Sequence, residues 1–258
     1  MISKDLKYFF ITLVFLCIIG FSVTIYTTNQ NILTYGSPIF MIFYGISGYS
    51  PALAALITIK IFSSNYSFIN FIKNITNIRK SFKEYFYVLI VTLVLWTIPF
   101  IVVEFHRGKS ILLNEPLISL VWITPIMIFG GGLEEIGWRG YLLPKLLKKY
   151  SDFTSSLIVG SIWSLWHLPL WFVVGTPQQG TNFLPFALTC IASSFILTYI
   201  YTETSSIWLC ILFHALDNAC SYVFKYDVGM HIVVSIATCA AGFFIFYFSK
   251  KYIRLKSI

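Results

Sequence analysis

Charged residues are scarce in this sequence, at 11% of its 258 positions. Soluble domains carry about 25%, so an ordinary globular domain is excluded. Hydrophobic residues make up 57% and fall in long blocks rather than in alternation. Such blocks predict an all-α fold class, a polytopic membrane bundle of about eight transmembrane helices.

Several chemical signatures are also missing. The five cysteines lie in hydrophobic segments and form no C-x-x-C pair. They are typical of small buried apolar residues, which excludes a cysteine metal cluster or a disulfide framework. H-E-x-x-H, the usual helical metal signature, is absent, as is the G-x-S-x-G of serine hydrolases.

The hydrophobic blocks define the expected spans. In chain order they cover residues 8–26, 38–61, 85–103, 116–143, 153–174, 183–201, 206–224 and 230–248. Gly45, Gly48 and Pro51 inside the second block predict close packing or a kink. Because we find no internal repeat and no linker, we expect one domain over 1–258 with a motif core at about 116–224.

The basic residues indicate how the spans are oriented. The net charge of +8 points to loops that face anionic lipid, and no basic stripe with exposed aromatics suggests nucleic acid. With the N-terminus in the cytoplasm, the basic residues in outer segments are only Arg107, Lys109 and Lys225. The positive-inside rule therefore predicts that both termini are cytoplasmic. No A-x-A-like cleavage site follows the first block, so we expect it to be a retained helix.

Most ionisable residues outside the loops fall in three places. They are Glu134, Glu135 and Arg139 on the fourth span, His167 on the fifth, and His214 with Asn218 nearby on the seventh. A charge at the bilayer centre costs about 2.5–3.5 kcal/mol on insertion scales, so these residues need a compensating reason. By helical rise all three places lie roughly 13–20 Å from the cytoplasmic face. We therefore expect them to form one cluster.

Helical spacing separates the two carboxylates. Glu135 and Arg139 are four residues apart with the acid first, the favourable order for an ion pair. Glu134 is rotated by about 100° from Glu135, so it points elsewhere. His214 and Asn218 are also four residues apart and share a face. We expect Arg139 to neutralise Glu135 and to leave Glu134 for chemistry.

This arrangement is typical of hydrolysis. Glu134 would take a proton from water, and His167 would orient that water and later protonate the leaving amine. His214 and Asn218 would donate hydrogen bonds to the developing oxyanion.

The same residues also allow structural interpretations. A Glu–Arg pair can simply fix helix packing, a buried Glu can relay protons or ions, and membrane histidines can bond between helices.

Neighbouring residues have similar alternatives. Gly130 to Gly132 can serve close helix approach, and Asp217 can act as a local cap or partner. Pro144 and Pro169 are expected to end or kink helices, with no chemical role.

In combination, the motifs resemble a known family. Glu134-Glu135-x-x-x-Arg139, then an aromatic-x-x-x-His from Trp163 to His167, then His214-x-x-x-Asn218 is similar to the CAAX protease and bacteriocin-processing (CPBP, or Abi) family. The resemblance implies an intramembrane endopeptidase in which Glu134 and His167 activate water. It also implies that His214 and Asn218 form the oxyanion site, supported by Glu135 and Arg139. The family usually has Phe where this chain has Trp163.

The resemblance leaves the cofactor open. We favour glutamate-type, metal-free chemistry and assign no metal ligand, although one Glu and two His can also hold Zn²⁺ with an open position. Other intramembrane proteases fit less well. Tyr226-Asp227 resembles half of an aspartyl presenilin-type pair, but no Gly-x-Gly-Asp accompanies it.

The expected partners are the lipid bilayer and a membrane-associated peptide or protein substrate that enters from the bilayer or the cytoplasmic face. We expect no nucleic acid, and the oligomeric state stays open. The Lys/Asn/Ile/Phe-rich composition suggests a bacterial cell membrane. The alternative function is a non-proteolytic bacteriocin immunity or membrane scaffold protein of the same fold. A transporter ranks last because internal repeats are missing.

Overall fold

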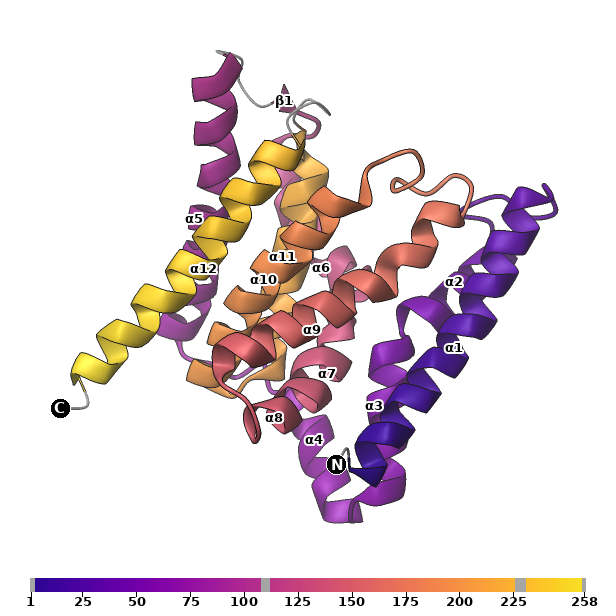
Figure 1. Cartoon of the computed structure of the whole chain (residues 1–258), viewed down its shortest axis with the longest axis horizontal. Coiled ribbons are helices and arrows are strands. Elements are labelled where there is room, and N and C mark those ends of the chain that lie inside the picture. Colours follow the sequence, from indigo (N-terminus) through magenta and orange to yellow (C-terminus); the bar gives the residue numbers. More distant parts are fainter. Residues whose placement is uncertain (1–2, 108–111, 226–230, 257–258) are drawn as a thin grey trace.

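Long apolar runs fold as helices because a bilayer offers the backbone no outside hydrogen-bond partners. The computed structural model of the chain describes residues 3–107, 112–225 and 231–256, and most of them are helical (Figure 1). The longest helices are α1 (Lys4–Asn29), α5 (Phe82–Arg107), α9 (Asp152–His167), α10 (Phe183–Thr204), α11 (Ile207–Val223) and α12 (His231–Lys256). Two-residue strands β1 (Leu112–Leu113) and β2 (Phe224–Lys225) pair antiparallel. The predicted all-α class is confirmed.

Three helical segments of the described chain are long and apolar enough to cross a membrane. They are α1, the interrupted segment Leu117–Leu147, and α10. A fourth is obtained if α2 (Pro38–Gly48) and α3 (Ser50–Phe62), which are bent by 56°, count as one span. Several membrane helices are thus present, while the count of eight and the side of each terminus stay predictions.

The bend between α2 and α3 is the kink predicted inside the second block. It falls at Tyr49, just before Pro51, which lies in the first turn of α3. Proline is tolerated there because the amide hydrogens of a first helical turn have no intrahelical acceptor. The basic connector that follows contains helix α4 (Asn65–Thr76), whose first turn is capped by the Ser64 hydroxyl.

The fourth predicted span is present as the segment Leu117–Leu147, but it is built from several short helical pieces. Its pieces are η1 (Leu117–Ser119), α6 (Leu120–Phe129), η2 (Gly132–Glu134), α7 (Glu135–Gly137), the π-helical turn η3 (Trp138–Leu142) and α8 (Leu143–Leu147). The break lies at Gly130 and Gly131, where Gly131 has a φ of 156° that no helix contains. The α-helical part of the fifth span also stops early, since α9 ends at His167 and η4 (Leu168–Phe172) follows with Pro169.

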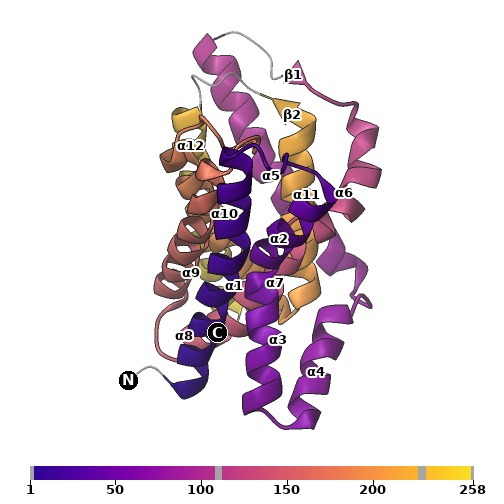
Figure 2. The ribbon, with the colours of Figure 1, turned by 90° about the vertical axis from the view of Figure 1, so that its right-hand side faces the viewer.

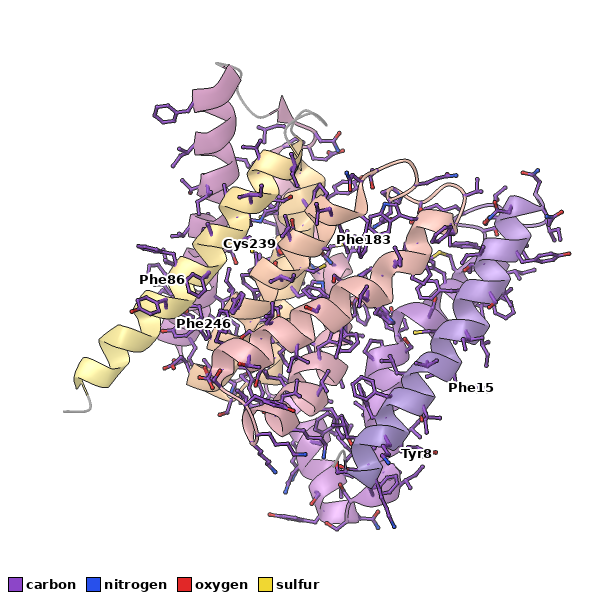
Figure 3. All side chains as sticks on the ribbon, viewed as in Figure 1. Tyr8, Phe15, Phe86, Phe183, Cys239 and Phe246 are labelled. Atoms are coloured by element: carbon purple, nitrogen blue, oxygen red, sulfur yellow. The ribbon has the colours of Figure 1, made fainter. Side chains whose placement is uncertain are left out.

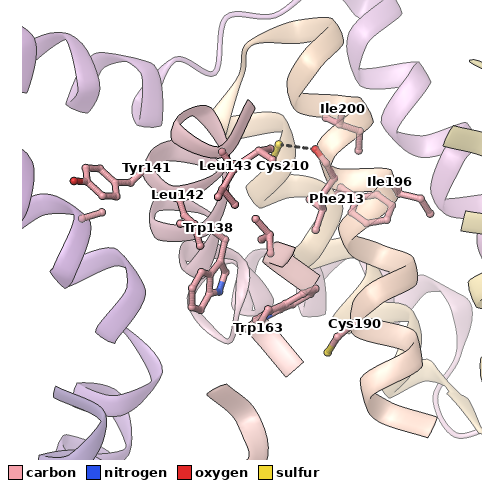
Figure 4. Close-up of a cluster of buried hydrophobic side chains, with 14 of the residues drawn as sticks. Trp138, Tyr141, Leu142, Leu143, Trp163, Cys190, Ile196, Ile200, Cys210 and Phe213 are labelled. Atoms are coloured by element: carbon pink, nitrogen blue, oxygen red, sulfur yellow. Dashed lines mark hydrogen bonds between the residues drawn. The ribbon is translucent and has the colours of Figure 1, made fainter. Parts of the chain in front are cut away.

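The core lies where α9, α10 and α11 meet η3 and α8. Trp138, Leu143 and Phe213 are completely buried in it, and Figure 4 shows them in one cluster that also includes Trp163, Ile196 and Cys210. The outer face of the bundle is apolar as well. Phe15 on α1 points away from the other helices (Figure 3) and is 61% exposed. Such a surface suits lipid rather than water.

The bundle has two distinct ends. The N-terminus, the turn between α3 and α4, and α8 lie at one end (Figures 1 and 2). The strands β1 and β2 and the loop between η4 and α10 lie at the other. The first end carries the predicted cytoplasmic lysines of α3, α4 and α8, and we call it the basic end. Its basic residues include Lys60, Lys73, Lys145 and Lys148.

Candidate active site

The break in the fourth span positions the site. With a φ of 156°, Gly131 has a backbone conformation that L side chains rarely adopt. Gly132 allows close approach, because an added Cβ there would lie 2.9 Å from the Ile211 carbonyl oxygen on α11. These glycines therefore bring the start of η2 directly against α11. This is the close approach that the glycines predicted.

Glu134, at the end of η2, is buried, with only 7% of its surface exposed. Its Oε2 accepts a hydrogen bond of 2.7 Å from the Trp163 indole on α9. Its Oε1 lies 4.0 Å from His167 Nε2. The carboxylate therefore faces α9 and the bundle interior rather than lipid.

His167 is the last residue of α9. Its Nδ1 lies 2.9 Å from the Trp163 carbonyl oxygen. Because a carbonyl can only accept, Nδ1 carries the hydrogen and donates it. In the neutral ring Nε2 is then an acceptor, and it faces Glu134 across a gap that one bridging water can fill.

Glu135 joins two basic side chains. Its Oε2 lies 2.9 Å from Arg139 Nη1, and its Oε1 lies 2.9 Å from His214 Nδ1. Glu135 and Arg139 are fully buried, so the ion pair is shielded from solvent. The Glu135–Arg139 pairing is the one expected from their spacing. The bond to His214 was not anticipated, and it turns His214 Nε2 toward the site.

Three of the four predicted catalytic side chains meet at Gly131. An added Cβ at Gly131 would lie 2.5 Å from Asn218 Nδ2, 3.2 Å from His214 Nε2 and 3.7 Å from Glu134 Oε1. His167 reaches the same region through its contact with Glu134. The structure thus brings together donors from α11 and a carboxylate from η2, at a point where any side chain on residue 131 would obstruct them.

Trp163 is the residue that sequence reasoning missed. We treated it as an aromatic replacement for Phe, yet its N–H holds Glu134. Its ring also lies 5.1 Å from the Arg139 guanidinium and 5.1 Å from the His214 ring. A signal was present, because Trp163 lies four residues before His167 and a buried indole N–H usually has an acceptor.

A cavity of about 540 Å³ adjoins the cluster and includes Asn218 in its wall. Asp217 also lines this cavity. Its hydrogen-bond partners lie on other helices, rather than nearby on its own helix as expected. It accepts hydrogen bonds from the Trp96 indole at 2.9 Å and the Ser193 hydroxyl at 3.1 Å. Asp217 therefore ties α11 to α5 and α10.

Two further expectations concern a metal site and the Tyr226-Asp227 pair. In the ranges that the structure describes, no three His, Cys, Asp or Glu side chains are grouped so as to hold a metal ion. Metal-free chemistry stays a prediction. Tyr226-Asp227 lies outside the described residues.

The fold and the buried polar cluster define an integral membrane protein of the helical-bundle class. Residues 116–220 match the family model described as type II CAAX prenyl endopeptidase Rce1-like. A curated relative, CAAX prenyl protease 2 of Methanococcus maripaludis, is 36% identical over 103 residues, which covers 36% of this chain and 37% of the relative. The chain thus spans little more than a third of that relative. Over the matched segment, the resemblance to the CAAX protease family is confirmed.

We predict that Arg139→Met strongly destabilises the protein, by roughly 3–5 kcal/mol, because it removes the fully buried arginine that pairs with the buried Glu135 charge. Thermal unfolding in detergent measures the loss. The double variant Glu135→Gln, Arg139→Met removes both charges and should recover part of the stability. A double variant less stable than Arg139→Met alone would contradict this account of the pair.

Proposed function

We propose that this protein is an intramembrane endopeptidase that hydrolyses a peptide bond in a membrane-associated peptide or protein. The observation that carries the proposal is the convergence of Glu134, His214 and Asn218 at Gly131, with His167 beside Glu134. Hydrolysis needs a base for water and donors for an oxyanion within one small space. The match to an Rce1-like endopeptidase family supports the same reaction class.

In the proposed reaction, one water is held between Glu134 Oε1 and His167 Nε2. Glu134 takes a proton from this water as the new C–O bond forms at the substrate carbonyl. The Trp163 indole holds the other carboxylate oxygen, so Oε1 is left to the water. The proton then passes, with help from His167, to the leaving amine as the C–N bond breaks.

The oxyanion is stabilised from α11. Asn218 Nδ2 donates one hydrogen bond, and Nε2 of a doubly protonated His214 donates the second, with Glu135 as its counter-ion. These donors are held in place before the reaction, which is what makes an oxyanion site effective in a water-poor interior.

The substrate class follows from the membrane location. The matched relative is named a CAAX prenyl protease, so a lipid-anchored protein end is one candidate. A peptide matured at a bacterial membrane is the other, in line with the composition. Both present a peptide bond to a site within the bundle.

Glu134→Gln should abolish cleavage while leaving the fold intact, because the amide keeps the shape but cannot take the proton. Loss of a general base costs about 10²–10⁴-fold in rate. Purified protein in detergent with a peptide library measures this. The matched control is Glu115→Gln, outside the site, which should cleave normally. Unchanged cleavage by Glu134→Gln would defeat the assignment and leave a binding role, as in an immunity or scaffold protein.

Trp163→Phe should slow cleavage without abolishing it. The ring stays, but the hydrogen bond to the carboxylate is lost, and such bonds contribute about 1.5–3 kcal/mol. The expected fall in kcat is about 10–100-fold. KM should stay unchanged, because the bond that is lost joins Trp163 to Glu134 and not to the substrate. A raised KM with normal kcat would contradict a role in positioning Glu134.

Glutamate-type chemistry predicts that metal chelators leave the activity unchanged. The measurement is cleavage after treatment with a chelator and dialysis. Activity that is lost on chelation and returns with zinc would overturn the metal-free proposal.

A further inference from the structure

The bend between α2 and α3 contacts the broken fourth span on both sides of the catalytic acids. We call its residues Tyr49, Ser50 and Pro51 the bend triplet. The triplet lies at the start of α3, which runs beside both α1 and α7 (Figure 1). It is outside the segment 116–220 that matches the family model. The family match therefore assigns it no part in the reaction.

Tyr49 holds the end of α6, the helix that stops at the break. Its hydroxyl donates a hydrogen bond of 2.8 Å to the carbonyl oxygen of Phe129, the last residue of α6. In a continuous helix this carbonyl would accept from the amide of Leu133, four residues later. A carbonyl without a donor is costly in a membrane interior, because no water is there to bond it. Tyr49 therefore supplies, from the bend, a donor that the break removes.

This bond lies directly before the break. Gly130 and Gly131 follow Phe129, and Glu134 is the fifth residue after it. The turn at Gly131, with its φ of 156°, sets where the Glu134 carboxylate lies. Because the turn departs from the end of α6, the Tyr49 bond fixes one side of it.

The other two residues of the bend triplet contact the chain beyond the turn. An added Cβ at Gly137 would lie 2.4 Å from the Pro51 carbonyl oxygen, so α7 packs directly against the bend. The Ser50 hydroxyl accepts a hydrogen bond of 3.0 Å from the Trp166 indole, whose ring lies 4.5 Å from the His167 ring. The bend triplet thus contacts both sides of the turn and the neighbour of the proposed water-holding histidine.

The bend triplet is separate from the cavity beside the site. The described residues that line this cavity come from α5, η4, the loop before α10, α10, α11, β2 and α12, and none of them belongs to α2 or α3. Tyr49 therefore acts on chemistry in this cavity through Phe129 and the turn rather than through the substrate.

From these contacts we infer that Tyr49 is a positioning residue of the proposed peptidase. Its hydroxyl holds the end of α6, and through the glycine turn it keeps the Glu134 carboxylate beside Asn218, His214 and His167. The inference rests on the proposed function for the reaction, whereas the hold on the break is a property of the fold alone.

The first test is amide hydrogen exchange in detergent, read by mass spectrometry over residues 126–137. Tyr49→Phe removes the hydroxyl and keeps the ring, and the matched control is Tyr66→Phe, because Tyr66 on α4 is 76% exposed at the basic end. Tyr49→Phe should speed exchange in this segment by about tenfold, since an acceptor that water does not reach loses its donor. Tyr66→Phe should exchange like the parent chain.

The second test is cleavage by the same two variants. Tyr49→Phe should lower kcat at least about tenfold, because small displacements of catalytic groups cost up to about 10²-fold. KM should stay unchanged, and Tyr66→Phe should cleave normally. This split between kcat and KM separates positioning from substrate binding.

Unchanged exchange over residues 126–137 would overturn the inference, whatever the kinetics show. So would faster exchange in all helices alike, which marks a general loss of stability, and so would a raised KM with normal kcat. Faster exchange at the break with unchanged kcat would also overturn it. A parent chain that cleaves nothing defeats the proposed function instead, and the exchange pattern then still decides whether Tyr49 holds the break.

Discussion

Two adjacent carboxylates buried in a membrane protein are the constraint on which the rest of the site depends. A buried charge is tolerated only when partners compensate its lost hydration. Glu135 has Arg139 and His214, and Glu134 has the Trp163 indole. These partners come from α9, η3 and α11, so satisfying the two acids draws three parts of the chain together. The polar cluster and the packing of the core are therefore one arrangement.

The glycine break makes this arrangement possible. A continuous helix through residues 130–135 would have kept every backbone group bonded along the span. The turn at Gly131 instead places the Glu134 carboxylate beside Asn218 and His214, with no side chain at residue 131 in the way. Membrane proteins accept such irregular backbone only where it is buried or lines a cavity. Here it adjoins a cavity whose wall includes Asn218.

Much of the fold, and one ion pair of the site, could be predicted from the sequence. Long apolar blocks determine helices, and an acid four residues before an arginine predicted the Glu135–Arg139 pair. The prolines and glycines marked the α2–α3 bend and the end of α9. The break inside the fourth span was not predicted, because an apolar pattern does not report the φ of one glycine. Asp217 was assigned local partners, since spacing alone cannot identify Trp96 or Ser193 on other helices.

By itself, the sequence determined a helical membrane protein and the residue types available for chemistry, because hydropathy and local spacing are properties of the chain. Only the tertiary structure decided which atoms face one another. It gave Glu135 a second partner in His214, made Trp163 the donor to Glu134, and placed the Tyr49 hydroxyl on the carbonyl before the break. Such contacts join residues from separate helices, and their geometry depends on how those helices pack.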